Sequence, residues 1–206
     1  MVSSVAGTFS AVFAPEYFVL LCTLALIGYE WRAAPARNYP GLAVRVGALA
    51  AAWAVAYVVY DAGPVLFDTV PEWGPDFTGS LGIAVGFFLL WAVWRLRIWG
   101  PLLPALSAVL LGLTVPHLLL TPFWDVSSHV AYAAAPAGYL ALLDRRFSPL
   151  LAAPVGMVVA RPLAGAHTWP ESIGGLLLAA GVLACFRYVR GRESDAFNTA
   201  AREIRP

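Results

Sequence analysis

The sequence contains no lysine, and all 13 of its basic residues are arginine. This absence excludes chemistry that needs a lysine side chain, such as a retinal Schiff base, a Schiff-base aldolase or a P-loop lysine. Charge of either sign is also scarce, because only 12% of the residues are charged against about 25% in soluble domains. The net charge of +1 gives no basic footprint, so we expect no nucleic-acid partner.

Cysteine is equally rare. Cys22 and Cys185 lie within apolar runs, and they form neither a disulfide framework nor a CxxC metal site. We interpret both as small buried hydrophobic side chains. The N-terminal stretch 1–18 lacks a basic n-region and a convincing cleavage site, so we expect it to be retained.

Apolar residues dominate what remains: they make up 60% of the 206 residues, with a mean hydropathy of +0.74. A spanning helix needs about 20 residues, so the chain predicts an all-α, polytopic membrane bundle of about seven transmembrane helices, or six if a weak run fails. One transmembrane domain would occupy 1–190 and a polar cytoplasmic tail 191–206. The predicted spans are 14–31, 41–60, 77–98, 101–120, 127–143, 148–161 and 170–190.

Arginine marks every second connection between these spans. The connections and span ends that carry it hold Arg32, Arg37, Arg45, Arg95, Arg97, Arg145 and Arg146. The loop 61–76 holds instead the acidic residues Asp61, Asp68, Glu72 and Asp76. The positive-inside rule then predicts a cell-membrane protein with its N-terminus outside and its C-terminus in the cytoplasm. We interpret the loop 61–76 as solvated.

All three histidines fall toward the outer face in this topology. His117 is near the end of one span, His129 begins the next, and His167 lies in the last outer loop. Asp125 precedes His129 and Glu171 follows His167, so polar groups from several spans meet at one depth. Ionisable residues gathered in this way predict a functional site more often than a set of incidental hydrogen bonds.

The strongest local pattern is Arg161-x5-His167-x3-Glu171. It supplies a guanidinium fork for anionic oxygens, an imidazole able to attack, and a carboxylate to orient that imidazole. Arg161 is also the one arginine that this topology places on the outer side. The bland alternative is a proline- and glycine-rich loop whose Arg161 extends to the interface.

A second pattern, Ser127-Ser128-His129, stands where a helix is predicted to begin. Free backbone N–H groups at a helix start bind anions, and serine hydroxyls add further donors. A simple N-cap formed by Asp125 or Ser127 is the alternative interpretation. That alternative explains the serines but not the histidine.

The segment 122–185 resembles the second half of the type 2 phosphatidic acid phosphatase superfamily, which includes the vanadium haloperoxidases. That family carries Pro-Ser-Gly-His at the start of one span and Ser-Arg-x5-His-x3-Asp between the next two. The corresponding runs are Val126-Ser127-Ser128-His129 and Ala160-Arg161-x5-His167-x3-Glu171. The resemblance covers about a third of the chain.

The resemblance implies a metal-free and cofactor-free phosphatase. His167 would be the nucleophile that forms a phosphohistidine, Glu171 would orient it, and His129 would protonate the leaving alkoxide. The phosphate-binding groups would be Arg161, Ser127, Ser128 and His117.

The family's first motif, Lys-x6-Arg-Pro, is missing. The best register is Thr114-x6-Thr121-Pro122, which keeps only the proline. Two phosphate-binding cations are therefore lost, and a protonated His117 is the replacement we expect for one of them.

We therefore expect a lipid-phosphate phosphatase that works at the outer face on a phosphomonoester or pyrophosphate. One alternative is a catalytically degenerate protein that binds an anionic lipid or acts as a scaffold. Another is a seven-span zinc hydrolase that takes its ligands from the three histidines, Asp125 and Ser127 or Ser128.

Overall fold

The computed structural model describes residues 2–33, 38–62, 65 and 69–203, with side chains described up to Gly191. Arg37 and Asp68, two charges used in the topology argument, lie outside the described residues. The regular elements are all helical, which confirms the predicted all-α class. They are α1 (Val2–Val12), α2 (Pro15–Ala33), α3 (Tyr39–Tyr60), α5 (Gly74–Arg97), α6 (Leu102–Leu120), α7 (Ser128–Leu143), the 3₁₀ helix η1 (Arg145–Leu151), α8 (Ala152–Leu163) and α9 (Trp169–Glu203).

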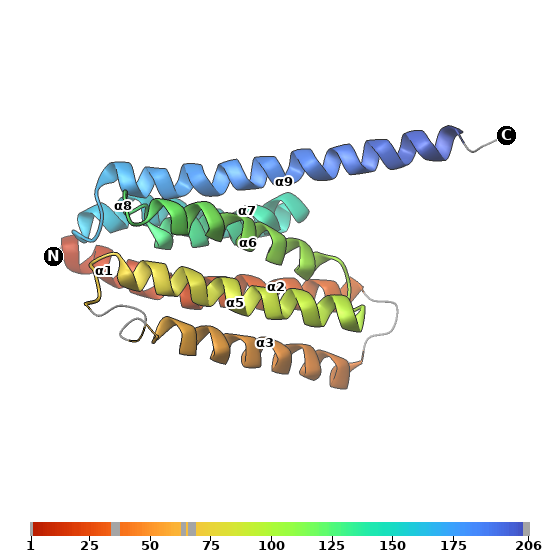
Figure 1. Cartoon of the computed structure of the whole chain (residues 1–206), viewed down its shortest axis with the longest axis horizontal. Coiled ribbons are helices and arrows are strands. Elements are labelled where there is room, and N and C mark those ends of the chain that lie inside the picture. Colours follow the sequence, from red (N-terminus) through yellow and green to blue (C-terminus); the bar gives the residue numbers. More distant parts are fainter. Residues whose placement is uncertain (1, 34–37, 63–64, 66–68, 204–206) are drawn as a thin grey trace.

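The long helices lie side by side along one direction, with α3 on the outside of α5 (Figure 1). Helix α7 is the most deeply buried element, and an unbroken run from Val130 to Ala137 is closed to solvent. Five of those eight residues are alanine, whose small side chains let neighbouring helices approach closely. The core thus forms around α7, and the start of α7 is also where the candidate site lies.

Glycines set two of the close helix contacts. A Cβ at Gly82 of α5 would lie 2.5 Å from the carbonyl oxygen of Ala56 in α3. A Cβ at Gly175 of α9 would lie 2.6 Å from the carbonyl oxygen of Ser127 at the start of α7. Such small-residue contacts are a common way to pack helices in membranes. The second contact draws the beginning of α9 against the beginning of α7.

The predicted number of spans is wrong. By length and composition, the described residues contain four helices able to cross a membrane, α3, α5, α6 and the Trp169–Gly191 part of α9, or five if α1 and α2 form one bent span. The predicted spans 127–143 and 148–161 correspond to α7, of 16 residues, and α8, of 12. At about 1.5 Å per residue, α7 reaches about 24 Å, less than a hydrocarbon core of about 30 Å.

At both ends of the described chain, helix extends beyond the predicted spans. Helix α1 precedes the predicted first span and meets α2 at a bend of 44°. Pro15 opens α2, and a proline fits a first helical turn but not a helix interior. At the other end, α9 runs without a break into the predicted tail and reaches Glu203.

Candidate functional site

Five helix ends meet at one end of the bundle. Asp76 lies in the first turn of α5, Arg161 in the last turn of α8 and Glu171 in the first turn of α9. His117 lies in the last turn of α6, and His129 is the second residue of α7. Figure 1 shows this end where α8 and the beginning of α9 lie near the N-terminus. The fold therefore gathers side chains that are up to 95 positions apart in the sequence, Asp76 and Glu171 being the extremes.

His167 is the centre of the arrangement, and its side chain is only 2% exposed. Its Nε2 lies 3.7 Å from Oδ2 of Asp76. Its Nδ1 lies 3.7 Å from Oδ2 of Asp125 and 3.6 Å from Oε2 of Glu171. Neither ring nitrogen has a hydrogen-bond partner within the described part of the chain. Three carboxylates thus surround one imidazole without completing a hydrogen bond to it. We call these four residues, Asp76, Asp125, His167 and Glu171, the His167 centre.

Glu171 is held by a local motif at the start of α9. Its Oε2 accepts a hydrogen bond from the backbone N–H of Thr168 at 2.7 Å, and the Thr168 hydroxyl accepts one from the Glu171 N–H at 3.5 Å. This reciprocal pair is a capping box. It fixes the carboxylate beside Nδ1 of His167, so the structure brings the predicted His167–Glu171 pair together.

Burial and charge both act on Asp125, which lies in the loop before α7. Burial raises the pKa of its carboxyl, and the negative charges of Asp76 and Glu171 raise it further. His167 and Arg161 act in the opposite direction. Oδ1 of Asp125 is buried without a hydrogen-bond partner among the described residues. This carboxylate is therefore short of positive charge and of donors.

Ser128 and His129 connect the His167 centre to a pocket. The Ser128 hydroxyl donates to Oδ1 of Asp76 at 2.8 Å and lies 3.4 Å from Nδ1 of His129. Ser127 is fully buried, and its backbone N–H donates to the carbonyl oxygen of Glu171 at 3.2 Å. The Ser127 hydroxyl has no partner among the described residues. Ser127 therefore ties α7 to α9, while Ser128 and His129 face the pocket.

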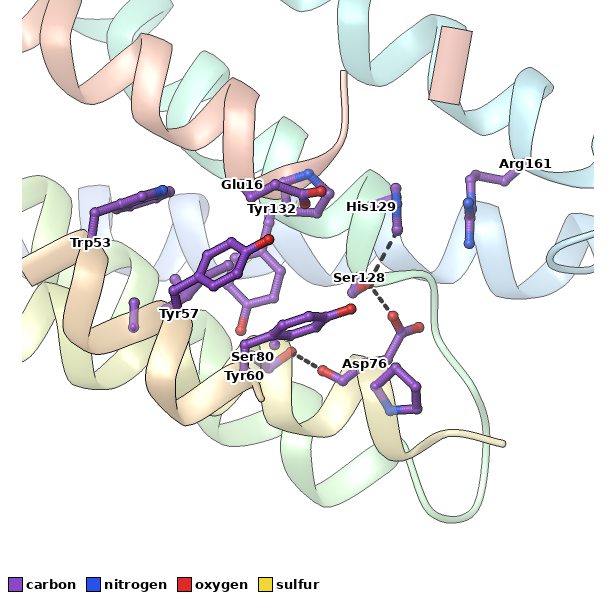
Figure 2. Close-up of a pocket in the computed structure, with 15 residues that line it drawn as sticks. Glu16, Trp53, Tyr57, Tyr60, Asp76, Ser80, Ser128, His129, Tyr132 and Arg161 are labelled. Carbon is purple, nitrogen blue, oxygen red and sulfur yellow. Dashed lines mark hydrogen bonds between the residues drawn. The ribbon is translucent and has the colours of Figure 1, made fainter. Parts of the chain in front are cut away.

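The pocket has a volume of about 420 Å³ and two chemically distinct ends. Its polar end is lined by Asp76, Ser128, His129 and Arg161 (Figure 2). Its other end is lined mainly by aromatic and aliphatic side chains, Trp53, Tyr57 and Tyr60 of α3 and Ile83 of α5, and the Glu16 carboxylate of α2 lies beside the tyrosines (Figure 2). A cavity of this shape and lining fits an amphiphile.

Arg161 is the one basic residue among the described residues that line this pocket. Its Nε is buried and has no hydrogen-bond partner in the described part of the chain. A buried donor without a partner is costly unless a ligand or water satisfies it. The guanidinium is thus available to an anionic group in the pocket.

His117 is turned away from the His167 centre. Its Nε2 donates to the carbonyl oxygen of Val126 at 3.0 Å, and its Nδ1 lies 3.1 Å from the hydroxyl of Ser80. The ring is fully buried and packs beside Tyr132. These contacts engage both ring nitrogens of His117 within the protein, and its predicted phosphate contact stays a prediction.

Asp76 is the member of the site that the sequence did not single out. We had assigned it to a solvated acidic loop, whereas it lies in the first turn of α5, between His167 and the pocket. The available signal was its position at the beginning of a predicted span, on the same side as the histidines. The cluster in the structure also differs from the zinc site predicted from the sequence. It contains one histidine, His167, instead of three, and it contains Asp76 instead of a serine.

Comparison with known proteins found no matching family model, no matching curated protein and no matching solved structure. The resemblance to the type 2 phosphatidic acid phosphatases therefore stays a prediction from short motifs.

Proposed function

We propose that this protein is a membrane-embedded hydrolase that removes phosphate from a lipid phosphate. The observation that carries the proposal is the two-ended pocket, in which Arg161 and His129 line one end and three aromatic residues of α3 line the other. A lipid tail fits the aromatic end, while the anionic head meets the only guanidinium that the described lining offers.

Three polar residues of the pocket then have a role in the reaction. Arg161 binds phosphate oxygens through its planar fork. Ser128 adds a hydroxyl and, at the helix start, a free backbone N–H. His129 lies beside Ser128, and burial together with the charge of Arg161 lowers its pKa to about 4. The negative charge of a bound phosphate raises that pKa again, which lets His129 give a proton to the leaving lipid oxygen.

The Asp76 carboxylate limits how His167 could attack a phosphate group. Direct attack by His167, as the resemblance implies, uses Nε2, because Glu171 faces Nδ1. Nε2 faces the Asp76 carboxylate at 3.7 Å, and His167 itself does not line the pocket. A phosphate group in reach of Nε2 would therefore meet a negative charge that something must neutralise.

The charges at the two ends of the bundle support assigning the pocket to the extracytoplasmic side. Arg95 and Arg97 end α5, whereas Asp76 begins it, and Arg145 and Arg146 follow the far end of α7. Arginine gathers on cytoplasmic sides, so the pocket end would face outward. The arginines mark the same end of the bundle whatever the number of spans.

The test is phosphate release by the purified protein from phosphatidate and polyprenyl phosphate in mixed micelles. We expect Arg161→Gln to lower the rate by about 10²–10³-fold, the usual cost of one lost contact to developing charge. Arg95→Gln, at the other end of α5, is the matched control and should keep the wild-type rate. Phosphate-lipid binding without release in the wild type would favour the alternative of a catalytically degenerate lipid-binding protein.

A further inference from the structure

The His167 centre carries more negative charge than its surroundings compensate. Asp76, Asp125 and Glu171 contribute three carboxylates within 3.7 Å of one imidazole. Arg161 is the cation that acts on Asp125 across the site. Buried charges in proteins are paired or bind metals. These carboxylates would repel a phosphate group unless a further cation lies among them.

The unsatisfied atoms show where that cation fits. One ligand atom each from Asp76, Asp125 and His167 lies within 4.8 Å of the others. Ligands of a tetrahedral Zn²⁺ ion at about 2.0–2.2 Å are about 3.3–3.6 Å apart. Side-chain movements of up to about 1.5 Å would therefore close the three groups around an ion.

His167 is the independent observation that separates this site from a simple acidic cluster. Its side chain is 98% buried, its ring lies among the carboxylates, and both ring nitrogens lack a hydrogen-bond partner within the described residues. Glu171, fixed by its capping box, and Asp125 both stand beside Nδ1, while Nε2 faces Asp76. A carboxylate behind a histidine ligand is a recurring feature of metal sites, because it fixes the tautomer and the ring orientation.

We propose that Asp76, Asp125 and His167 bind one divalent transition-metal ion, with Glu171 as the positioning residue behind His167. Two carboxylates and one imidazole suit Zn²⁺ or Mn²⁺. Asp125, whose side chain is 39% exposed, leaves the ion a route to water, and Asp76 is the ligand that also lines the pocket.

The ion has a specific use in the proposed phosphatase, on which this part of the inference rests. It supplies the positive charge that the missing Lys-x6-Arg-Pro motif does not. It also makes His167 a ligand, so water becomes the nucleophile. The water oxygen forms a bond to phosphorus and the bond from phosphorus to the lipid oxygen breaks. That oxygen takes a proton from His129, and the proton lost by the water passes to solvent, which the partly exposed Asp125 side chain admits.

The test begins with metal binding by the purified full-length protein in detergent. After EDTA treatment and removal of the chelator, the protein is titrated with Zn²⁺ and Mn²⁺, and bound metal is counted by elemental analysis. We expect one ion per chain in the wild type and at least tenfold weaker binding in Asp76→Asn and in Asp125→Asn. Glu72→Gln removes an exposed charge from the same loop and is the matched control, expected to bind like the wild type.

Folding and binding must be separated in this test. Asparagine has the size of aspartate, and the metal-free melting temperatures of the variants show whether each is folded. Equal weak binding in the wild type and both folded variants would overturn the site.

Phosphate release distinguishes this inference from the proposed function. Release that EDTA abolishes and Zn²⁺ or Mn²⁺ restores supports both. Release that survives EDTA in metal-free protein overturns the metal site and leaves the phosphatase standing. One bound ion without release from any lipid phosphate supports the metal site and counts against the phosphatase.

Discussion

Two buried acidic environments stand at opposite ends of the bundle, and they differ in how completely their polar atoms are satisfied. At the arginine-bearing end, Glu30 of α2 is 7% exposed and accepts hydrogen bonds from Nε1 of Trp94 at 3.1 Å and from the backbone N–H of Leu102 at 2.8 Å. At the other end, His167 lies among three carboxylates, and neither of its ring nitrogens has a hydrogen-bond partner in the described chain.

The backbone is shaped around Glu30. Gly100 has a φ of +136°, and a Cβ there would lie 2.2 Å from Oε1 of Glu30. Glycine alone adopts this conformation at little cost, so the α5–α6 connection closes tightly over the carboxylate. Glu30 thereby links α2 to the end of α5 and the start of α6, which is a structural task.

The comparison shows how to separate structural from functional polar groups in an apolar bundle. Burial alone does not separate them, because Glu30 and His167 are both buried. What separates them is whether the fold already provides the partners. A saturated carboxylate holds helices together, whereas a buried cluster that lacks partners is prepared for a ligand.

The largest effect should come from His167→Ala. We expect phosphate release to fall by at least about 10³-fold, since the substitution removes either the metal ligand or the nucleophile. The melting temperature should stay close to that of the wild type, because the ring makes no hydrogen bond within the described residues. A folded variant that keeps full activity would remove His167 from the site.

Glu30→Ala should show the opposite pattern. The buried Nε1–H of Trp94 and the partly buried N–H of Leu102 lose their acceptor, and at about 1–3 kcal/mol each the free energy of unfolding should fall by about 2–6 kcal/mol. Activity per folded molecule should not change. Chemical denaturation followed by tryptophan fluorescence measures the free energy of unfolding. The rate of phosphate release normalised to folded protein measures the activity. A loss of activity per folded molecule without a loss of stability would contradict the structural role of Glu30.

His117→Ala tests the histidine that lies near the site without joining it. The substitution leaves the Val126 carbonyl oxygen and the Ser80 hydroxyl without this partner, so we expect a loss of about 1–3 kcal/mol. The rate of phosphate release should fall far less than in His167→Ala. A rate loss equal to that of His167→Ala, in folded protein, would return His117 to the phosphate-binding set.

The smallest effect concerns Asp125 in metal-free protein. Because its folded-state pKa is raised, the folded state holds the proton more tightly than the unfolded state does. Stability is therefore lost as the pH rises from the unfolded-state pKa to the raised folded-state value. Asp125→Asn should melt slightly higher than the wild type at pH 7, and the difference should vanish in acid. A lower melting temperature at pH 7 would show that the carboxylate is already compensated.

Hydrophobic runs predicted the helix positions well, since each predicted span corresponds to a helix near its expected bounds. They failed on the span count, because a buried central helix such as α7 is as apolar as a lipid-facing one and only its length of 16 residues separates the two. Spacing within one segment predicted the approach of Glu171 to His167. No local pattern predicted Asp76, whose place in the site depends on how α5 packs against α3 and α6.

The directions of the side chains also could not be predicted from the sequence. His117 lies at the expected end of the bundle, yet its ring nitrogens form hydrogen bonds with the Ser80 hydroxyl and the Val126 carbonyl oxygen. Depth in a membrane can be inferred from position along a span. The direction of a ring depends on the helix rotation and on neighbours far away in the chain.

The most direct test of the account is the rate of phosphate release before and after metal is removed and restored. We predict that EDTA abolishes release from a lipid phosphate and that one equivalent of Zn²⁺ or Mn²⁺ restores it in the wild type but not in Asp76→Asn. Release that continues unchanged in EDTA, from protein shown to hold no metal, would contradict the cation-dependent His167 centre.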